Sequence, residues 1–224
     1  MSIAEAIRKR KSVRGYKSDP VPRKVLREIL EVAGRSPSAM NTQPWEFTVI
    51  AGEVLNNVRK ATVELLNSGT PPCPEHLVVG WSMDSVYRQR QVELAKQIFH
   101  LMEIPREDKE KRGQWMERGF RYFDAPAAII ISVDRSLTEV GPLLDVGAAM
   151  QSICLAALEH GLGTCIEDQG NMYPDVLRRL AGIPESKRII ISIAIGYPDD
   201  SFPANKLEST REPVENLTTW IGFD

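Results

Sequence analysis

Two runs of small and β-branched residues, at positions 127–133 and 188–196, constrain the fold of this chain more than any other feature. The first run reads Ala-Ala-Ile-Ile-Ile-Ser-Val, and the second reads Arg-Ile-Ile-Ile-Ser-Ile-Ala-Ile-Gly. A strand with one face in water alternates between apolar and polar residues, whereas these runs stay apolar throughout. The sequence therefore predicts central strands that are buried on both faces.

Weaker patterns predict the other elements near these strands. Residues 45–50 and 164–167 are further strand candidates. Helices are predicted over 21–34 and 173–182, because each stretch ends at a glycine that can close a helix.

Residues 83–122 differ in character from the rest of the chain. They are rich in Arg, Gln, Glu and Lys and carry only scattered apolar side chains. This composition predicts two exposed helices, with a break at Ile104 and Pro105.

Residues 143–160 are almost wholly small and apolar, which describes a helix that is buried all round. Such a helix is unusual in a monomer of 224 residues. Two interpretations stay open: the helix lies in a subunit interface, or it lies at the centre of one subunit's core.

Length and charge bound the class of protein. A chain of 224 residues that is 42% hydrophobic can bury a core as one domain, here residues 1–224. The formal net charge of -2 gives no electrostatic reason to expect a nucleic-acid partner. The histidines and cysteines lack the spacing of a metal site, so no metal is predicted.

Cysteine usage and hydropathy predict a soluble, cytoplasmic protein without a membrane anchor. The apolar stretches at 125–133 and 189–195 fall short of the roughly 20 residues that span a bilayer. The odd number of cysteines without paired spacing predicts reduced thiols at Cys73, Cys154 and Cys165.

The stretch from 8 to 17 places six cations in ten residues. A helical pattern precedes it, and Val13 and Gly15 end that pattern, so the chain is expected to run extended. In an extended segment Arg10, Ser12 and Arg14 point the same way. Two guanidiniums and a hydroxyl suit a phosphate, or a ring edge that becomes anionic on reduction. A solvated basic face is the alternative.

The loop from 36 to 45 reads Ser-Pro-Ser-Ala-Met-Asn-Thr-Gln-Pro-Trp. Pro37 and Pro44 restrict the backbone between them. Ser38, Asn41 and Gln43 offer hydrogen-bond donors and acceptors that suit the edge of a flat heterocycle. The alternative is a Ser/Asn-rich turn that enters a strand.

Together these two motifs resemble those of the FMN-dependent nitroreductase family. The resemblance continues through residues 161–165, 182–184, 195–198 and 211–213, so it spans nearly the whole chain. Residues 112–126 are most similar to its nitrobenzoate-reductase-like branch.

The resemblance implies an α+β fold, with a central mixed, mainly antiparallel sheet surrounded by helices. It also implies an intertwined homodimer in which residues 83–122 form a variable helical lid. The implied flavin contacts come from four parts of the chain: Arg10, Lys11, Ser12, Arg14, Pro37, Ser38, Ala39, Asn41, Gln43, Cys165, Glu167 and Arg211.

The roles of these contacts also follow from the resemblance. Arg10, Lys11, Ser12 and Arg211 would share the phosphate and ribityl contacts, and Arg14 or Arg10 would face the ring edge. The 37–43 loop would contact the ring edge, in part across the subunit boundary. Residues 165–168 would pass near the flavin N5, although Glu167 and Asp168 could instead be structural carboxylates. No catalytic side chain is predicted.

The implied activity is reduction of nitroaromatic or related electrophilic aromatic substrates. NADH or NADPH would be the transient donor, in a ping-pong hydride transfer through bound FMN. The alternatives are a reductive dehalogenase, a flavin-fragmenting enzyme, and a non-enzymatic anion-binding module.

Five arginines of the variable segment bear on the substrate. If one faces the pocket, it would favour 4-nitrobenzoate over nitrobenzene; the alternative is a solvated helix face. The five are Arg88, Arg90, Arg112, Arg118 and Arg121.

Overall fold

A four-stranded sheet forms the centre of the computed structural model, which describes residues 1–77 and 80–223. Its strand order is β1-β2-β4-β3, and every neighbouring pair is antiparallel. A parallel contact is added at the β3 edge, where Ser12 pairs with Thr164. The strands are β1 (Trp45–Ala51), β2 (Ala127–Asp134), β3 (Gly163–Glu167) and β4 (Lys187–Gly196).

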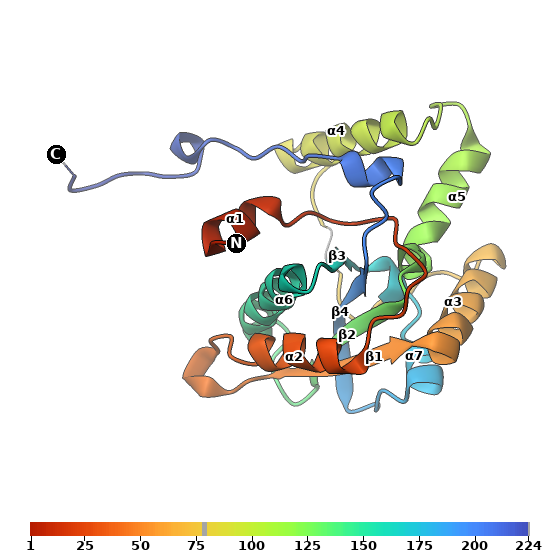
Figure 1. Cartoon of the computed structure of the whole chain (residues 1–224), viewed down its shortest axis with the longest axis horizontal. Helices are drawn as coiled ribbons and strands as arrows, with labels where there is room; N and C mark the ends of the chain where they lie inside the picture. Colours follow the sequence, from red (N-terminus) through yellow and green to blue (C-terminus); the bar gives the residue numbers. More distant parts are fainter. Residues whose placement is uncertain (78–79, 224) are drawn as a thin grey trace.

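Helices cover both faces of this sheet (Figure 1). Side chains alternate along β2: Ile129 and Ile131 pack on the side of α2 and α6, and Ile130 packs on the side of α3 and α7. The continuous apolar runs are thus explained by two separate cores, one on each face. The helices are α1 (Ile3–Lys9), α2 (Arg23–Ala33), α3 (Gly52–Asn67), α4 (Val86–Leu101), α5 (Lys109–Phe120), α6 (Gly141–Glu159) and α7 (Pro174–Ala181).

Most elements predicted from the sequence are confirmed. The four strands match to within a few residues, and α4 and α5 are the two helices expected in the variable segment. α7 ends at Gly182, whose φ of 71° is a left-handed conformation that glycine adopts without strain. α3 was not predicted.

The prediction that the 143–160 helix is buried all round is wrong within one chain. Val146, Ile153 and Ala157 of α6 lie in the core, but the side chain of Leu144 is 85% exposed. One face of α6 therefore packs on the sheet and α2, while an apolar part of it stays open in the single subunit.

α6 also corrects the hydropathy argument. Among the residues that the structure describes, α6 is the helix that is both long enough and apolar enough to cross a membrane, with a mean hydropathy of 1.4. The prediction that all apolar stretches fall far short of a span overlooked it. Its packing against α2 and the sheet is that of a core helix.

A partly buried ion cluster anchors the proline-rich loop at 71–74 to the sheet. Glu75 accepts hydrogen bonds from Arg178 Nη2, at 2.7 and 2.8 Å, and from the backbone N–H of Ile189, at 2.8 Å. Arg135 also contacts Glu75. Arg178 has a second carboxylate partner, Glu185, whose side chain is 84% exposed.

We predict that Glu75→Ala lowers the free energy of unfolding by about 3–5 kcal/mol, because it removes the buried carboxylate partner of Arg178 and leaves only the exposed Glu185. Urea denaturation measures this loss. Glu185→Ala is the matched control and should cost less than about 1 kcal/mol, because that pair faces water. Equal losses in the two variants would contradict the assignment.

Candidate functional site

The basic N-terminal segment runs extended along the free edge of β3, as predicted. The backbone N–H of Val13 donates to the carbonyl of Thr164 at 2.9 Å, and Tyr16 forms a bridge with Pro198. The segment therefore acts as a short additional strand.

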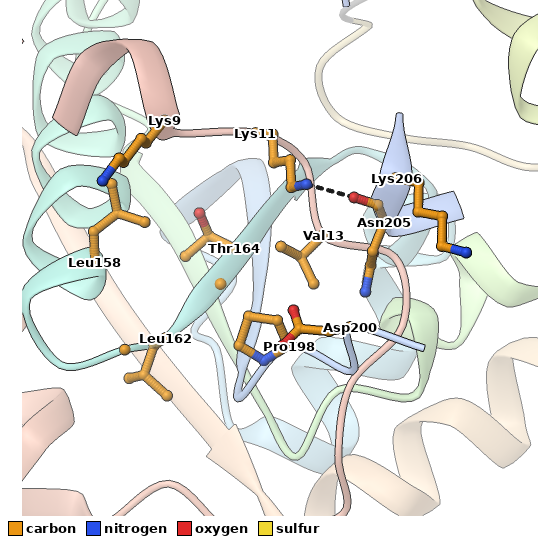
Figure 2. Close-up of a pocket in the computed structure, with 12 residues that line it drawn as sticks. Lys9, Lys11, Val13, Leu158, Leu162, Thr164, Pro198, Asp200, Asn205 and Lys206 are labelled. Carbon is orange, nitrogen blue, oxygen red and sulfur yellow. Dashed lines mark hydrogen bonds between the residues drawn. The ribbon is translucent and has the colours of Figure 1, made fainter. Parts of the chain in front are cut away.

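Asn205, which the sequence analysis missed, holds this segment in place. Its Oδ1 accepts from the backbone N–H of Arg14 at 2.7 Å, and its Nδ2 donates to the carbonyl of Gly15 at 2.7 Å. Its own carbonyl accepts from Lys11 Nζ at 2.5 Å, as Figure 2 shows. Asn205 is only 5% exposed. No spacing rule in the sequence singles it out, because its partners lie about 190 residues away.

Gly15 has a steric reason to be glycine. A Cβ at this position would lie 2.1 Å from the ring of Phe202. The close approach lets the 10–16 segment and the 202–205 turn pack together.

A cavity of about 630 Å³ brings together three of the predicted cofactor contacts, Arg10, Lys11 and Arg211. Arg8 and Lys9 also line it, and Glu208 is the one carboxylate among its lining residues. Five cations against one anion make a strongly positive cavity, and the guanidiniums suit a phosphate monoester. The donor set therefore fits the phosphate end of FMN.

A second, smaller cavity of about 320 Å³ lies on the other side of the segment, beside β3 and the C-terminal end of α6 (Figure 2). Val13, Leu162 and Pro198 form apolar walls, while Lys9 and Lys206 lie at its rim. Lys11 lines both cavities.

Ser12 and Arg14 lie on the sheet side, next to Cys165. Arg14 is half-buried, with its guanidinium 5.9 Å from the centre of the Phe123 ring. Burial raises the pKa of the Cys165 thiol to about 11, although the Arg14 charge and the Ser12 hydroxyl oppose the rise. Cys165 is therefore a neutral thiol at pH 7 and is not a nucleophile.

Glu167 is buried at the end of β3. Its Oε2 accepts from the backbone N–H of Gly170 at 2.9 Å. Burial raises the pKa of Glu167 to about 8, and the charge of Asp168 acts in the same direction.

The predicted loop contacts lie apart from this group. The 36–43 loop leaves α2 and contacts α6, where the N–H of Ala39 donates to Asp145 at 3.2 Å. In Figure 1 it lies at the far side of α6 from the 10–14 segment, and neither cavity beside that segment is lined by the loop. One chain thus holds the predicted contacts in two groups, and Pro37, Ala39, Asn41 and Gln43 are exposed.

The loop backbone is strained. Met40, Asn41 and Gln43 have φ values of 52°, 58° and 46°, which non-glycine residues seldom adopt. Such conformations persist only where the surroundings impose them, and they gather at ligand-binding sites. The side chain of Met40 is 96% exposed, so no residue that the structure describes covers it.

A family model described as the nitroreductase family matches residues 7–197. The chain belongs to the nitroreductase family. The resemblance read from the two motifs is confirmed. The match covers the basic segment, the 36–45 loop and all four strands.

Named relatives agree with this membership. A nitrobenzene nitroreductase of Ectopseudomonas oleovorans is 33% identical over 98% of this chain and 96% of its own length. A 4-nitrobenzoate reductase of Nocardioides sp. (strain LMS-CY) is 29% identical over 97% and 89%. An FMN and NADPH-dependent nitroreductase, NfnB from Sphigopyxis sp. strain HMH, is 29% identical, with full coverage of both chains and a TM-score of 0.94. This structural agreement confirms the nitroreductase fold.

Two of the five arginines in the variable segment of this nitroreductase are structural. Arg118 pairs with Asp124 at 3.0 Å, donates to the carbonyl of Arg14 at 3.2 Å, and lies 4.8 Å from the Phe202 ring centre. Arg121 pairs with Asp124 at 2.8 Å. The solvated-face interpretation is therefore wrong for Arg118 and Arg121.

The other three arginines also have partners in the described part of the chain. Arg90 pairs with Glu212 at 2.9 Å. Arg112 lies 5.3 Å from the Phe99 ring centre, and Arg88 donates to Gln91.

We predict that Asn205→Ala destabilises the protein by about 2 kcal/mol or more, because it leaves buried backbone groups of residues 14 and 15 unpaired. Hydrogen exchange should accelerate at the Arg14 amide before the sheet amides. Asn216→Ala removes an exposed amide and is the control, with a change below about 0.5 kcal/mol. Unchanged exchange at Arg14 would argue against the clamp.

Proposed function

We propose that this nitroreductase is an FMN-dependent oxidoreductase that uses NAD(P)H to reduce nitroaromatic compounds in a ping-pong reaction. The observation that carries the proposal is the cavity at which Arg10, Lys11 and Arg211 meet, beside β3, in a chain of this family. The solved relative with the same fold is FMN and NADPH-dependent, which supports both the cofactor and the donor.

The residues have distinct roles in this proposal. Arg10, Lys11 and Arg211 hold the phosphate, and the Ser12 hydroxyl contacts the ribityl chain. Bound FMN supplies the two-electron acceptor and donor. Arg14 offers the positive charge of a guanidinium where the ring edge gains negative charge.

No side chain is proposed as an acid or nucleophile. The Cys165 thiol is neutral, because burial raises its pKa. Glu167 is buried, and its Oε2 accepts the backbone N–H of Gly170, so we assign it a structural role. Protons for the product then come from water.

We further propose that the enzyme is a homodimer in which the 36–43 loop of each subunit completes the flavin site of its partner. Apolar side chains stay uncovered on α1, on α6 and on the C-terminal segment, which extends away from the body (Figure 1). The same side of the molecule carries the strained, exposed loop. The uncovered residues include Ile3, Ile7, Met40, Leu144, Leu217, Trp220, Ile221 and Phe223.

A cytoplasmic location fits this proposal, because NAD(P)H is held there and thiols stay reduced. Cys73, Cys154 and Cys165 are all free in the structure.

For the substrate, we propose a nitroarene without a carboxylate. The arginines that could bind a carboxylate are engaged within the chain, and the partners of Arg118 include backbone that positions Arg14. The nitrobenzene nitroreductase is also more similar in sequence than the 4-nitrobenzoate reductase.

The other activities have less support. Reductive dehalogenation and flavin fragmentation are not favoured by the names of the relatives that are about a third identical. A non-enzymatic anion-binding module does not account for the strained loop or for membership of an enzyme family.

We predict that the purified protein is yellow, and that Arg211→Ala weakens FMN binding about tenfold or more. A lost charge-assisted hydrogen bond contributes about 1.5–3 kcal/mol. Quenching of flavin fluorescence during titration measures the affinity. Arg27→Ala is the control: it removes an exposed cation that pairs with Glu31, and the affinity for FMN should stay unchanged. A wild-type protein that binds no FMN would overturn the proposed function.

We predict that the protein sediments as a dimer at nanomolar concentration, because an obligate interface of this kind typically buries more than about 2,000 Å². Leu144→Glu should yield monomers that bind FMN poorly. Val54→Glu places the same charge on α3, on the other face of the sheet, and should remain dimeric. A wild-type monomer with bound flavin would refute both the dimer and the shared site.

We predict that nitrobenzene and 4-nitrobenzoate have kcat/KM values within about fivefold of each other, because an exposed ion pair contributes less than about 1 kcal/mol. NADPH-driven reduction of each compound measures the ratio. A strong preference for 4-nitrobenzoate that disappears in Arg90→Ala would instead support the carboxylate contact expected from the sequence.

A further inference from the structure

Glu167 is a buried carboxyl group without a counter-ion. Its side chain is 7% exposed at the end of β3, opposite Ser192 of β4. Oε2 accepts the N–H of Gly170, whereas Oε1 is buried and has no partner among the described residues. The charge that raises its pKa is that of Asp168, which has the same sign.

An ionised carboxylate in this place would be costly. A buried charge needs a cation or several donors, and an uncompensated one costs several kcal/mol. The backbone N–H of Gly170 at 2.9 Å, with a smaller contribution from the backbone N–H of Gln169, does not replace the lost water. The geometry therefore favours the neutral acid, and burial raises the pKa of Glu167 to about 8.

The turn that follows Glu167 is packed tightly against this carboxyl. Tyr122, which is fully buried, donates its hydroxyl to the carbonyl of Gly170 at 2.9 Å. A Cβ at Gly170 would lie 2.4 Å from the Tyr122 ring and 2.7 Å from Glu167 Oε1. Both backbone groups of Gly170 are thus held, one by Glu167 and the other by Tyr122.

The same turn connects to the variable segment and to the centre of the sheet. Gln169 Nε2 donates to the carbonyl of Met116 in α5 at 3.2 Å. Asn171 Oδ1 accepts from Ser192. A movement of residues 168–171 would therefore disturb contacts with β3, β4 and α5 at the same time.

We propose that Glu167 is a positioning residue: as a neutral carboxylic acid it fixes the 168–171 turn and keeps the end of β3 free of negative charge beside the flavin. This inference rests on the proposed function for the position of the flavin. The neutral state of Glu167 does not depend on it.

The sign of the pH effect follows from proton linkage. Glu167 has an ordinary pKa of 4.5 when unfolded and about 8 when folded, so between these values the folded protein binds the extra proton. Its stabilising contribution is complete below pH 4.5 and is lost as pH rises towards 8. The titratable groups that face it are Asp168, Cys165, Tyr122 and Tyr16, and the last three stay neutral in this range.

The test compares wild type with Glu167→Gln, which keeps the shape and cannot ionise. In the absence of FMN, the ratio of their unfolding constants should change about tenfold per pH unit between pH 5 and 7.5, with wild type losing stability relative to the variant. Infrared difference spectra should show a protonated carboxyl band at pH 6.5 that is missing in Glu167→Gln. A constant ratio, or a carboxylate band in its place, would overturn the proposal.

The positioning role has its own readout. In flavin-loaded protein, the midpoint potential of wild type should fall more steeply with pH above 7 than that of Glu167→Gln, because a new negative charge disfavours the reduced, more anionic cofactor. Parallel curves would refute the link to the flavin. If wild type binds no FMN, the proposed function fails, while the measurements without FMN still decide the state of Glu167.

If Glu167→Gln does not fold, the wild-type infrared titration alone decides the ionisation, because Glu167 is the carboxyl group expected to titrate near pH 8. A carboxyl band that persists above pH 6 and disappears near pH 8 supports the neutral acid. Its loss below pH 6 contradicts it.

Discussion

Burial of β2 and β4 on both faces is the constraint on which the rest of the structure depends. Their backbone groups are satisfied within the sheet, and their side chains require two apolar layers. α2 with α6 supplies one layer, and α3 with α7 supplies the other. Only the edges of the sheet are then left to carry function.

The candidate site lies at the β3 edge of the sheet. The N-terminal segment pairs with β3 through Val13, and Asn205 fixes the same segment from the C-terminal side. Two distant ends of the chain thereby bring Arg10 and Arg211 to one cavity. Cations that would be a diffuse solvated patch in an isolated segment become a site because backbone hydrogen bonds order them.

Charge is distributed in a way that suits a cofactor that gains electrons. Five cations line the cavity and the Arg14 guanidinium lies on the sheet side, whereas Cys165 and Glu167, buried along β3, are neutral. Burial is the main cause of the second half of this pattern, because it raises the pKa of both Cys165 and Glu167. A site of this kind combines positive charge with neutral buried acids, so that negative charge added to the cofactor is stabilised and meets no repulsion from these acids.

The sequence by itself determined the elements and the chemistry of the motifs. Apolar runs of the right length predicted the strands, and Val13 and Gly15, which end the preceding helical pattern, predicted an extended basic segment, because both signals are local. The motifs also indicated the family.

Only the tertiary structure decided which groups meet. Asn205 has partners about 190 residues away, the burial that neutralises Glu167 comes from η2 (Tyr122–Asp124) and β4, and Arg118 finds its partners through packing. The open face of α6 was misjudged for the same reason: composition records how apolar a helix is, whereas burial depends on what packs against it.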